Sequence, residues 1–318
     1  MRILSIVFIV FWIVSCVPEK AFNIVLLPDT QNYSERYPEI YRSQTNWIAQ
    51  NKDSIAFVLH QGDITNRNTS EQWENAVAAM SRLDGVIPYV MTIGNHDLGT
   101  TGSTDTRNSD LFNQYFPYSK HNQLSGFGGV FEPGKMENVW YTFYVGGLNW
   151  LVLSLEFGIR NKVLDWAKAI IEEHPKHKVI INTHAYMYSD DTRMGEGDKW
   201  LPQDYAIGKD SGEEAVNDGE QIWEKLVSRY PNILFVFSGH VLNDGVGTLV
   251  SVGNHGNKIY QMLANYQMIE NGGNGFLRIV TVNPTKKTVS VKSYSPYINE
   301  YKTDIEHQFS FKEVDFRH

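Results

Sequence analysis

Several apolar runs in this sequence end in side chains of the types that bind divalent metal ions. These residues are Asp29, Gln31, Asp63, Asn95, His184 and His240. Carboxylate, amide and imidazole groups together suit ions such as Mn, Fe or Zn. Water activated between two divalent ions is a strong nucleophile at neutral pH, and the ions also hold the oxygens of an ester during its displacement. The residue types therefore indicate metal-dependent hydrolysis of a small anionic ester.

The order of these residues along the chain is more specific than any one of them. The blocks are Asp29-Thr30-Gln31, Gly62-Asp63, Gly94-Asn95-His96-Asp97, His184 and Gly239-His240. This order resembles the calcineurin-like metallophosphoesterase family, whose pattern is D-x-H, G-D, G-N-H-D/E, H and G-H-x-H. The resemblance covers residues 29–242, and residues 94–97 are its most specific part. It implies hydrolysis of phosphate mono- or diesters on an α/β fold, a four-layer sandwich of two mixed β-sheets flanked by helices.

The resemblance also implies ligands for two metal positions. Asp63 would bridge both ions, because a carboxylate has two oxygens to share. Asp29 would hold the first ion, with Gln31 beside it. The second ion would be held by Asn95, His184 and His240. The expected cofactors are one or two divalent ions per chain, from among Mn, Fe, Zn and Mg.

Two further residues of the pattern are expected to act beside the metal position. His96 would be the catalytic residue that faces the substrate, where it stabilises developing charge or protonates the leaving oxygen, a role that suits a group titrating near neutrality. Asp97 is expected to support the turn. His60, shortly before Asp63, is interpreted as a structural histidine at the end of a strand.

Two positions depart from the family pattern. Gln31 stands where D-x-H has its histidine, and Leu242 stands where G-H-x-H has its last histidine. A glutamine carbonyl is a poorer ligand than imidazole for a transition metal, and leucine binds no ion. We therefore expect the first position to be weak, oxygen-rich or empty, with Asn243 or Asp244 as candidate replacements. The alternative function is a catalytically impaired protein that binds a metal or ligand on the same scaffold.

Short apolar runs alternate with amphipathic stretches from residue 21 onward, which is typical of an α/β sheet. Ligand sites of such sheets lie at the carboxyl ends of the strands, where the residues above are found. The chain lacks repeats and linkers, which indicates one domain over residues 22–318. Strands are predicted at 21–27, 55–59, 87–93, 139–145, 148–155, 178–183, 233–237, 247–252, 258–264, 276–282 and 288–294, and helices at 38–51, 70–83, 110–116, 163–173 and 218–229.

Two long polar stretches interrupt this alternation, at residues 99–134 and 186–217. Ordinary connections have about 4 to 6 residues, so these stretches are expected to face the substrate. Functional side chains concentrate on loops that a rigid scaffold supports. The candidate substrate-binding residues are therefore His121, Tyr186, Tyr188 and Arg193.

The first residues resemble the signal of a bacterial lipoprotein. Residues 3–17 are an apolar run behind a single positive charge, Arg2, and the run is short for a membrane span. Ile13-Val14-Ser15-Cys16 fits a cleavage site before an acylated cysteine. Cys16 is the only cysteine, so an intramolecular disulfide is excluded. We expect a signal peptide at 1–15, lipidation of Cys16, a short tether at 16–21 and a membrane-anchored protein of the cell envelope that faces the periplasm or the exterior. An uncleaved anchor helix is the alternative.

The charge of the chain bears on its partners. Lys and Arg number 28 against 36 Asp and Glu, a formal net charge of -8. Affinity for a nucleic-acid backbone comes mostly from neutralised phosphates, so this balance argues against such binding. The expected partners are a phosphate-ester substrate and the membrane that holds the lipid anchor.

Overall fold

The structure is a computed structural model that describes residues 20–317. The predicted signal peptide, Cys16 and most of the predicted tether lie outside the described residues. Within residues 20–317, none of the helices combines the length and the apolar character that crossing a membrane requires.

The described strands form two mixed sheets of seven strands each. The first sheet contains β1 (Phe22–Leu27), β2 (Ile55–His60), β3 (Tyr89–Met91), β11 (Leu277–Asn283), β12 (Thr288–Ser295), β13 (Glu300–Lys302) and β14 (Gln308–Lys312). Its order is β13-β12-β11-β1-β2-β3, and β14 also pairs with β12. The second contains β4 (Phe127–Val130), β5 (Val139–Val145), β6 (Leu148–Leu155), β7 (His177–Thr183), β8 (Ile233–Ser238), β9 (Val246–Val252) and β10 (Lys258–Ala264). Its order is β4-β5-β6-β7-β8-β10-β9.

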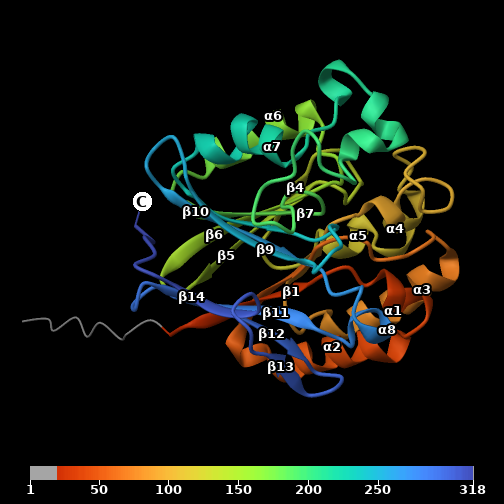
Figure 1. Cartoon of the computed structure of the whole chain (residues 1–318), viewed down its shortest axis with the longest axis horizontal. Coiled ribbons are helices and arrows are strands. Elements are labelled where there is room, and N and C mark those ends of the chain that lie inside the picture. The colour runs from red at the N-terminus through yellow and green to blue at the C-terminus, as the bar shows by residue number, and fades with distance from the viewer. Residues whose placement is uncertain (1–19, 318) are drawn as a thin grey trace, which may run out of the picture.

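Helices cover the outer face of each sheet. The described helices are α1 (Gln31–Glu35), α2 (Pro38–Gln50), α3 (Ser70–Met80), α4 (Asp110–Tyr115), α5 (Tyr118–His121), α6 (Asn161–Glu173), α7 (Gly219–Lys225) and α8 (Glu270–Gly273). Figure 1 shows α6 and α7 over the second sheet, and α1, α2 and α3 on the opposite side of the molecule, next to the first sheet. The predicted four-layer α/β sandwich is therefore confirmed.

The sequence explains how individual helices begin, pack and end. In α6 the buried residues recur at helical spacing, so one stripe faces the sheet; they are Val163, Leu164, Ala167, Ile170 and Ile171. The start of α7 is capped by Asp218, whose carboxylate accepts the backbone N–H of Gln221 at 2.9 Å. This helix ends earlier than the predicted residue 229, because Leu226 takes φ −133° and ψ −64°, outside the helical region.

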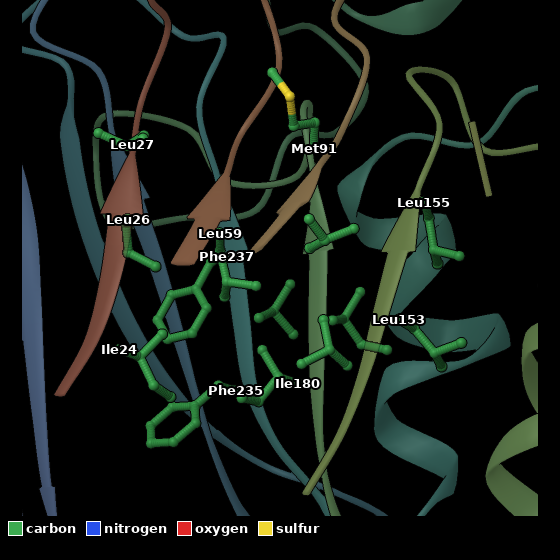
Figure 2. Packing of buried hydrophobic residues seen from close by; sticks show 14 of the residues in the cluster. Ile24, Leu26, Leu27, Leu59, Met91, Leu153, Leu155, Ile180, Phe235 and Phe237 are labelled. Carbon is green, nitrogen blue, oxygen red and sulfur yellow. The ribbon is translucent and has the colours of Figure 1, made fainter. Parts of the chain in front are cut away.

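The core lies between the two sheets. Phe57 of β2 packs against Tyr141 and Phe143 of β5, with ring centroids 5.8 and 5.1 Å apart, and Phe22 of β1 packs against Trp150 of β6 at 5.7 Å. Figure 2 shows more of this interface, which buried aliphatic and aromatic side chains from strands of both sheets fill. Burying each such side chain stabilises the fold by about 1.5–3 kcal/mol. This packing fixes the position of one sheet relative to the other.

The parallel strands of both sheets end at one edge of the sandwich. In the first sheet β1, β2 and β3 are parallel, and in the second β6, β7, β8 and β10 are parallel. Figure 2 shows the arrowheads of the strands that carry Leu27, Leu59 and Leu155 pointing in the same direction. Residues that follow these strands, though far apart in sequence, are thereby gathered at that edge.

Candidate metal centre

The predicted ligands follow the carboxyl ends of these parallel strands. Asp29, Asp63 and Asn95 come after β1, β2 and β3 of the first sheet, whereas His184 and His240 come after β7 and β8 of the second. All of these side chains are buried. The site therefore lies at the edge of the sandwich where the parallel strands of both sheets end.

The side chains of the second metal position place lone-pair atoms next to one another. His184 Nε2 lies 3.2 Å from Asp63 Oδ1, 3.1 Å from Asn95 Oδ1 and 3.2 Å from His240 Nδ1. The ligand atoms of Asp63, His184 and His240 all lie within 4.8 Å of one another. Separations near 3 Å are expected between ligands that share one cation at about 2.1 Å. We call Asp63, Asn95, His184 and His240 the ligand cluster.

Backbone carbonyls fix which nitrogen of each imidazole carries a hydrogen. His184 Nδ1–H donates to the Gln61 carbonyl at 2.7 Å, and His240 Nε2–H donates to the Trp200 carbonyl at 2.8 Å. Because a carbonyl only accepts, the two ring nitrogens that face each other carry lone pairs when both rings are neutral. Hydrogen bonds of this kind orient the metal-binding histidines of proteins.

The charges of the ligand cluster favour a bound cation. Burial lowers the pKa of His184, but the Asp63 carboxylate outweighs it and holds that pKa at about 9. Burial raises the pKa of Asp63, but His184 and His96 outweigh it and hold that pKa below its ordinary range. Burial, with the charge on His184, lowers the pKa of His240 to about 3. A proton on His184 Nε2 thus lies among the lone pairs of Asp63, Asn95 and His240. These residues fit one divalent ion in the position of that proton.

His96 lies between the ligand cluster and solvent. Its backbone N–H donates to Asp63 Oδ1 at 3.0 Å, and its Nδ1–H donates to the Asn66 carbonyl at 2.9 Å. Burial lowers the pKa of His96, but Asp63 and the Asn66 carbonyl raise it above its ordinary value. The ring therefore keeps Nε2 available to a bound molecule.

Asp97 serves the turn and not the cation site. Its carboxylate accepts the backbone N–H groups of Ile64 at 3.0 Å, Thr65 at 2.8 Å and Gly94 at 2.9 Å. These bonds connect the loop after β2 to the loop after β3. The interpretation of Asp97 as a supporting residue is confirmed.

His60 is also structural, as predicted. Its Nε2 pairs with Thr30 Oγ1 at 2.9 Å, and its Nδ1 accepts the backbone N–H of Gly62 at 3.2 Å. Burial lowers the pKa of His60 to about 3, so the ring stays neutral. It links the loops that carry Asp29 and Asp63.

Two glycines of the sequence pattern are explained by close approach to carboxylates. A Cβ atom at Gly94 would lie 2.1 Å from Asp63 Oδ1, and one at Gly239 would lie 2.2 Å from Asp29 Oδ1. A side chain at either position would displace the carboxylate beside it. The pattern therefore requires glycine there for packing around the site.

The first metal position differs from the second. Asp29 accepts hydrogen bonds from the amides of Asn265 at 2.9 Å and Gln267 at 3.3 Å, and from the backbone N–H of His240 at 3.2 Å. Burial raises the pKa of Asp29 to about 7. Leu242 lines the cleft at this point and has no ligand atom. Amide donors thus surround the carboxylate that would hold the first ion, and these residues do not fit a transition-metal position.

The other candidate ligands of the first metal position are Gln31, Asn243 and Asp244. Gln31 Oε1 is buried without a hydrogen-bond partner, so it is an uncommitted oxygen beside the cleft. Asn243 donates to Ser189 Oγ at 2.8 Å, and Asp244 accepts the backbone N–H of Val246 at 3.2 Å. Neither Asn243 nor Asp244 lines the cleft. They do not replace the missing histidines.

A cleft of about 140 Å³ opens beside the ligand cluster. It is lined by Gln31, Asp63, Asn95, His96, Trp200, Tyr205, His240, Leu242 and Gln267. Sequence reasoning missed four residues here, Asn265 and Gln267 around Asp29 and Trp200 and Tyr205 in the wall. Asn265 was detectable, because it directly follows the predicted strand 258–264. Polar residues that follow the other strands were chosen as candidate site residues, and the same reasoning selects Asn265. Trp200 and Tyr205 come from an irregular loop that carries no such signal.

The loop residues predicted to bind substrate do not line this cleft. His121 is buried and packs edge-on against Tyr89, with ring centroids 5.5 Å apart. Tyr186 is buried and donates to Gln261 Oε1 at 2.7 Å. The two others lie farther along the second loop.

Arg193 and Tyr188 are engaged with the protein itself. The Arg193 guanidinium lies 4.4 Å from the Trp223 ring centroid and pairs with Glu220 at 3.0 Å. Tyr188 stacks on Trp200 with centroids 6.4 Å apart, so it supports the cleft wall from behind. None of the four predicted substrate contacts lines the cleft. Of the two long loops, only the second contributes to the lining, through Trp200 and Tyr205.

Comparisons with known proteins agree with this geometry. The chain is 29% identical over 300 residues to the uncharacterized protein YvnB of Bacillus subtilis (strain 168), a match that covers 89% of this chain and 21% of that protein. The chain thus spans about a fifth of the length of that curated relative. Its fold is similar to purple acid phosphatase PPD1 from yellow lupin (Lupinus luteus) seeds, with a TM-score of 0.54 and 14% identity over 94% of this chain and 55% of that one.

The family assignment comes from the sequence of most of the domain. Residues 22–244, more than half of the chain, match the calcineurin-like phosphoesterase family. This range includes every residue of the ligand cluster. The chain belongs to the calcineurin-like phosphoesterase family.

Proposed function

We propose that this chain hydrolyses phosphate mono- or diesters with a divalent cation held by the ligand cluster. The observation that carries the proposal is the convergence of lone pairs from Asp63, Asn95 and His240 on His184 Nε2 at 3.1 to 3.2 Å. Such an arrangement is stable only with a proton or a cation among these atoms. Family membership supports a phosphate ester as the substrate.

The residues of the chain prepare the site before a substrate arrives. When bound, a divalent cation lowers the pKa of water and stabilises charge on the ester oxygens. The carbonyls of Gln61 and Trp200 keep the lone pairs of His184 and His240 directed inward. The site therefore needs little reorganisation during the reaction.

His96 supplies the proton in this proposal. Asp63 and the Asn66 carbonyl raise the pKa of His96 above its ordinary value, although burial opposes them. Its Nδ1–H is committed to the Asn66 carbonyl, so Nε2–H is the donor for the leaving oxygen. A raised pKa favours the protonated ring, which is the form that general acid catalysis requires.

The test compares turnover with metal binding in the full-length chain. We expect hydrolysis of p-nitrophenyl phosphate or bis-p-nitrophenyl phosphate with Mn, Mg, Zn or Fe, and loss of it in Asp63→Ala and Asn95→Ala. Asp244→Ala is the matched control, because this exposed carboxylate lies off the cleft. Equal activity in Asp63→Ala and Asp244→Ala would contradict the proposal.

A second candidate is a protein that binds a metal or ligand without turnover. The observation that favours it is the first position, where Asn265 and Gln267 donate to Asp29 and Leu242 replaces a ligand. Metal bound by wild type and lost in Asp63→Ala, with no ester hydrolysed, would support this candidate over the enzyme.

We propose further that the protein is anchored to the cell envelope through lipid on Cys16. The support is the sequence Ile13-Val14-Ser15-Cys16 after an apolar run. Labelled palmitate should appear in the wild-type protein and not in Cys16→Ser, and Cys16→Ser should leave the membrane fraction. Retention of Cys16→Ser in membranes would support an uncleaved anchor instead.

A further inference from the structure

The charge of the cleft is low for a site that binds phosphate. Among the described residues, those that line the cleft include no lysine or arginine. Nearby arginines are paired elsewhere: Arg67 with Glu35 at 3.0 Å and Arg107 with Asp210 at 3.3 Å. The cation of the ligand cluster is therefore the positive charge that this lining offers to a bound phosphate. A doubly charged phosphate monoester would thus be poorly compensated, whereas a singly charged diester would be matched.

The wall of the cleft is apolar and planar. Trp200, Tyr205 and Leu242 are all part of its lining, and Leu242 lies where the family pattern has a histidine. Tyr205 packs edge-on against Phe157, with ring centroids 5.1 Å apart, and its ring centroid lies 6.3 Å from that of His240. Aromatic side chains held in this way present rigid area at little entropic cost. We call Trp200, Tyr205 and Leu242 the cleft wall.

Trp200 is held at both its backbone and its side chain. Its carbonyl accepts His240 Nε2–H at 2.8 Å, and its φ of 63° is in the left-handed region that a bulky residue rarely occupies. Its ring stacks on Tyr188. Strain of this kind persists only where surrounding contacts enforce it, and it is common at ligand sites. Its backbone is therefore fixed next to His240, and its ring is held against Tyr188 at the lining of the cleft.

We propose that the substrate is a singly charged phosphodiester in which one ester group is planar, an aryl or nucleoside group that stacks on the cleft wall. The inference rests on the proposed hydrolytic function and adds the substrate class. The cation of the ligand cluster compensates the single charge, and Trp200 with Tyr205 contacts the planar group.

The experiment measures kcat and KM of the full-length chain with Mn on p-nitrophenyl phosphate, bis-p-nitrophenyl phosphate and methyl p-nitrophenyl phosphate at pH 8. We expect kcat/KM for bis-p-nitrophenyl phosphate to exceed that for the monoester by about tenfold or more. Trp200→Ala should raise KM for bis-p-nitrophenyl phosphate about five- to tenfold, the size expected for one lost stacking contact. Trp200→Phe should restore most of this loss.

Controls separate a stacking role from damage to the site. Trp166→Ala, a change at another half-buried tryptophan remote from the cleft, should leave KM unchanged. Metal bound per chain should be the same in Trp200→Ala and wild type; a lower value with equal losses on all three esters would show that Trp200 only positions His240, and would overturn the inference. Preference for the monoester would overturn it while leaving the proposed function intact. No turnover of any ester by the metal-loaded wild type would overturn both.

Discussion

Two buried polar clusters lie at the same edge of the sheets and balance their charge in different ways. One is the ligand cluster. The other surrounds Glu156, which follows β6 as His184 follows β7. Arg160 donates to Glu156 from Nε at 2.6 Å and from Nη2 at 2.8 Å, and it also pairs with Glu132 and Glu214 at 3.1 Å each. We call these residues the Arg160 cluster.

The difference shows how a metal site is distinguished from a structural ion pair. In the Arg160 cluster a bidentate guanidinium compensates Glu156, so no ligand is needed. Within residues 20–317, neither Asp63 nor Asp29 forms an ion pair with a lysine or arginine; Asp63 pairs with the His184 ring alone, at 3.2 Å. A carboxylate after a strand is therefore not evidence of a metal by itself. Among the described residues, what distinguishes the metal site is that its carboxylates have no lysine or arginine partner.

The largest expected effect comes from the same change made in both clusters, carboxylate to amide. Asp63→Asn should reduce kcat/KM by about 10³-fold or more, because the neutral amide stabilises the cation less, and several kcal/mol of charge stabilisation is at stake. Glu156→Gln should leave metal bound per chain unchanged. Steady-state kinetics and metal analysis measure both. A similar loss of metal in the two variants would remove the distinction between the clusters.

The next effect is on stability. Arg160→Ala removes the bidentate partner of buried Glu156 and leaves it only the side chains of Asn138 at 3.0 Å and Arg107 at 3.8 Å. This change costs about 3 kcal/mol, the lower end for a broken buried pair. The free energy of unfolding, measured with urea in the metal-free chain, should fall by that amount. Arg317→Ala is the matched control, because Arg317 forms an exposed pair with Asp315 and should leave unfolding unchanged within error. A loss below about 1 kcal/mol for Arg160→Ala would show that Arg160 does not stabilise Glu156 in the way the structure indicates.

A smaller effect is the pH dependence of metal binding. Burial lowers the pKa of His184, but Asp63 holds it at about 9, so below that pH a cation must displace the His184 proton. Affinity should therefore rise with pH, about tenfold per unit between pH 6 and 8, and level off above 9. Calorimetry in two buffers of different ionisation enthalpy should count about one proton released. Affinity that is constant from pH 6 to 8 would mean that His184 is not a ligand.

The smallest effect is on stoichiometry. The first position lacks both histidines of the pattern, and amides surround Asp29. Wild type should bind about one ion per chain, and Gln31→His with Leu242→His should raise this toward two, as completed ligand sets bind more tightly. Metal analysis after dialysis measures it. An unchanged value would show that these positions do not face the first ion.

Much of the fold was predictable because the apolar runs have clear periods. The predicted strands, from 21–27 to 288–294, and the predicted helices between them were found near their predicted positions. In the long stretch 99–134 the helix predicted at 110–116 was found as α4, whereas α5 and β4 were missed, since they are short and depend on tertiary contacts. The end of α7 was missed for the same reason, because the backbone at Leu226 follows no local signal.

The site was predictable where residues follow strands and unpredictable where they come from loops. Asp63, Asn95, His184 and His240 converge as the pattern indicated. Their roles as ligands stay predictions. Trp200 enters the cleft only because its irregular loop folds back on His240, a long-range contact that neither periodicity nor spacing encodes.

The most direct test of the cation site is anomalous diffraction. Crystals of the chain grown with Mn should be measured on both sides of the Mn absorption edge. We expect one anomalous peak per chain, within about 2.3 Å of His184 Nε2, His240 Nδ1 and the Asp63 and Asn95 side-chain oxygens. A map with no peak among these atoms, or with Mn bound only elsewhere, would contradict the proposed cation site.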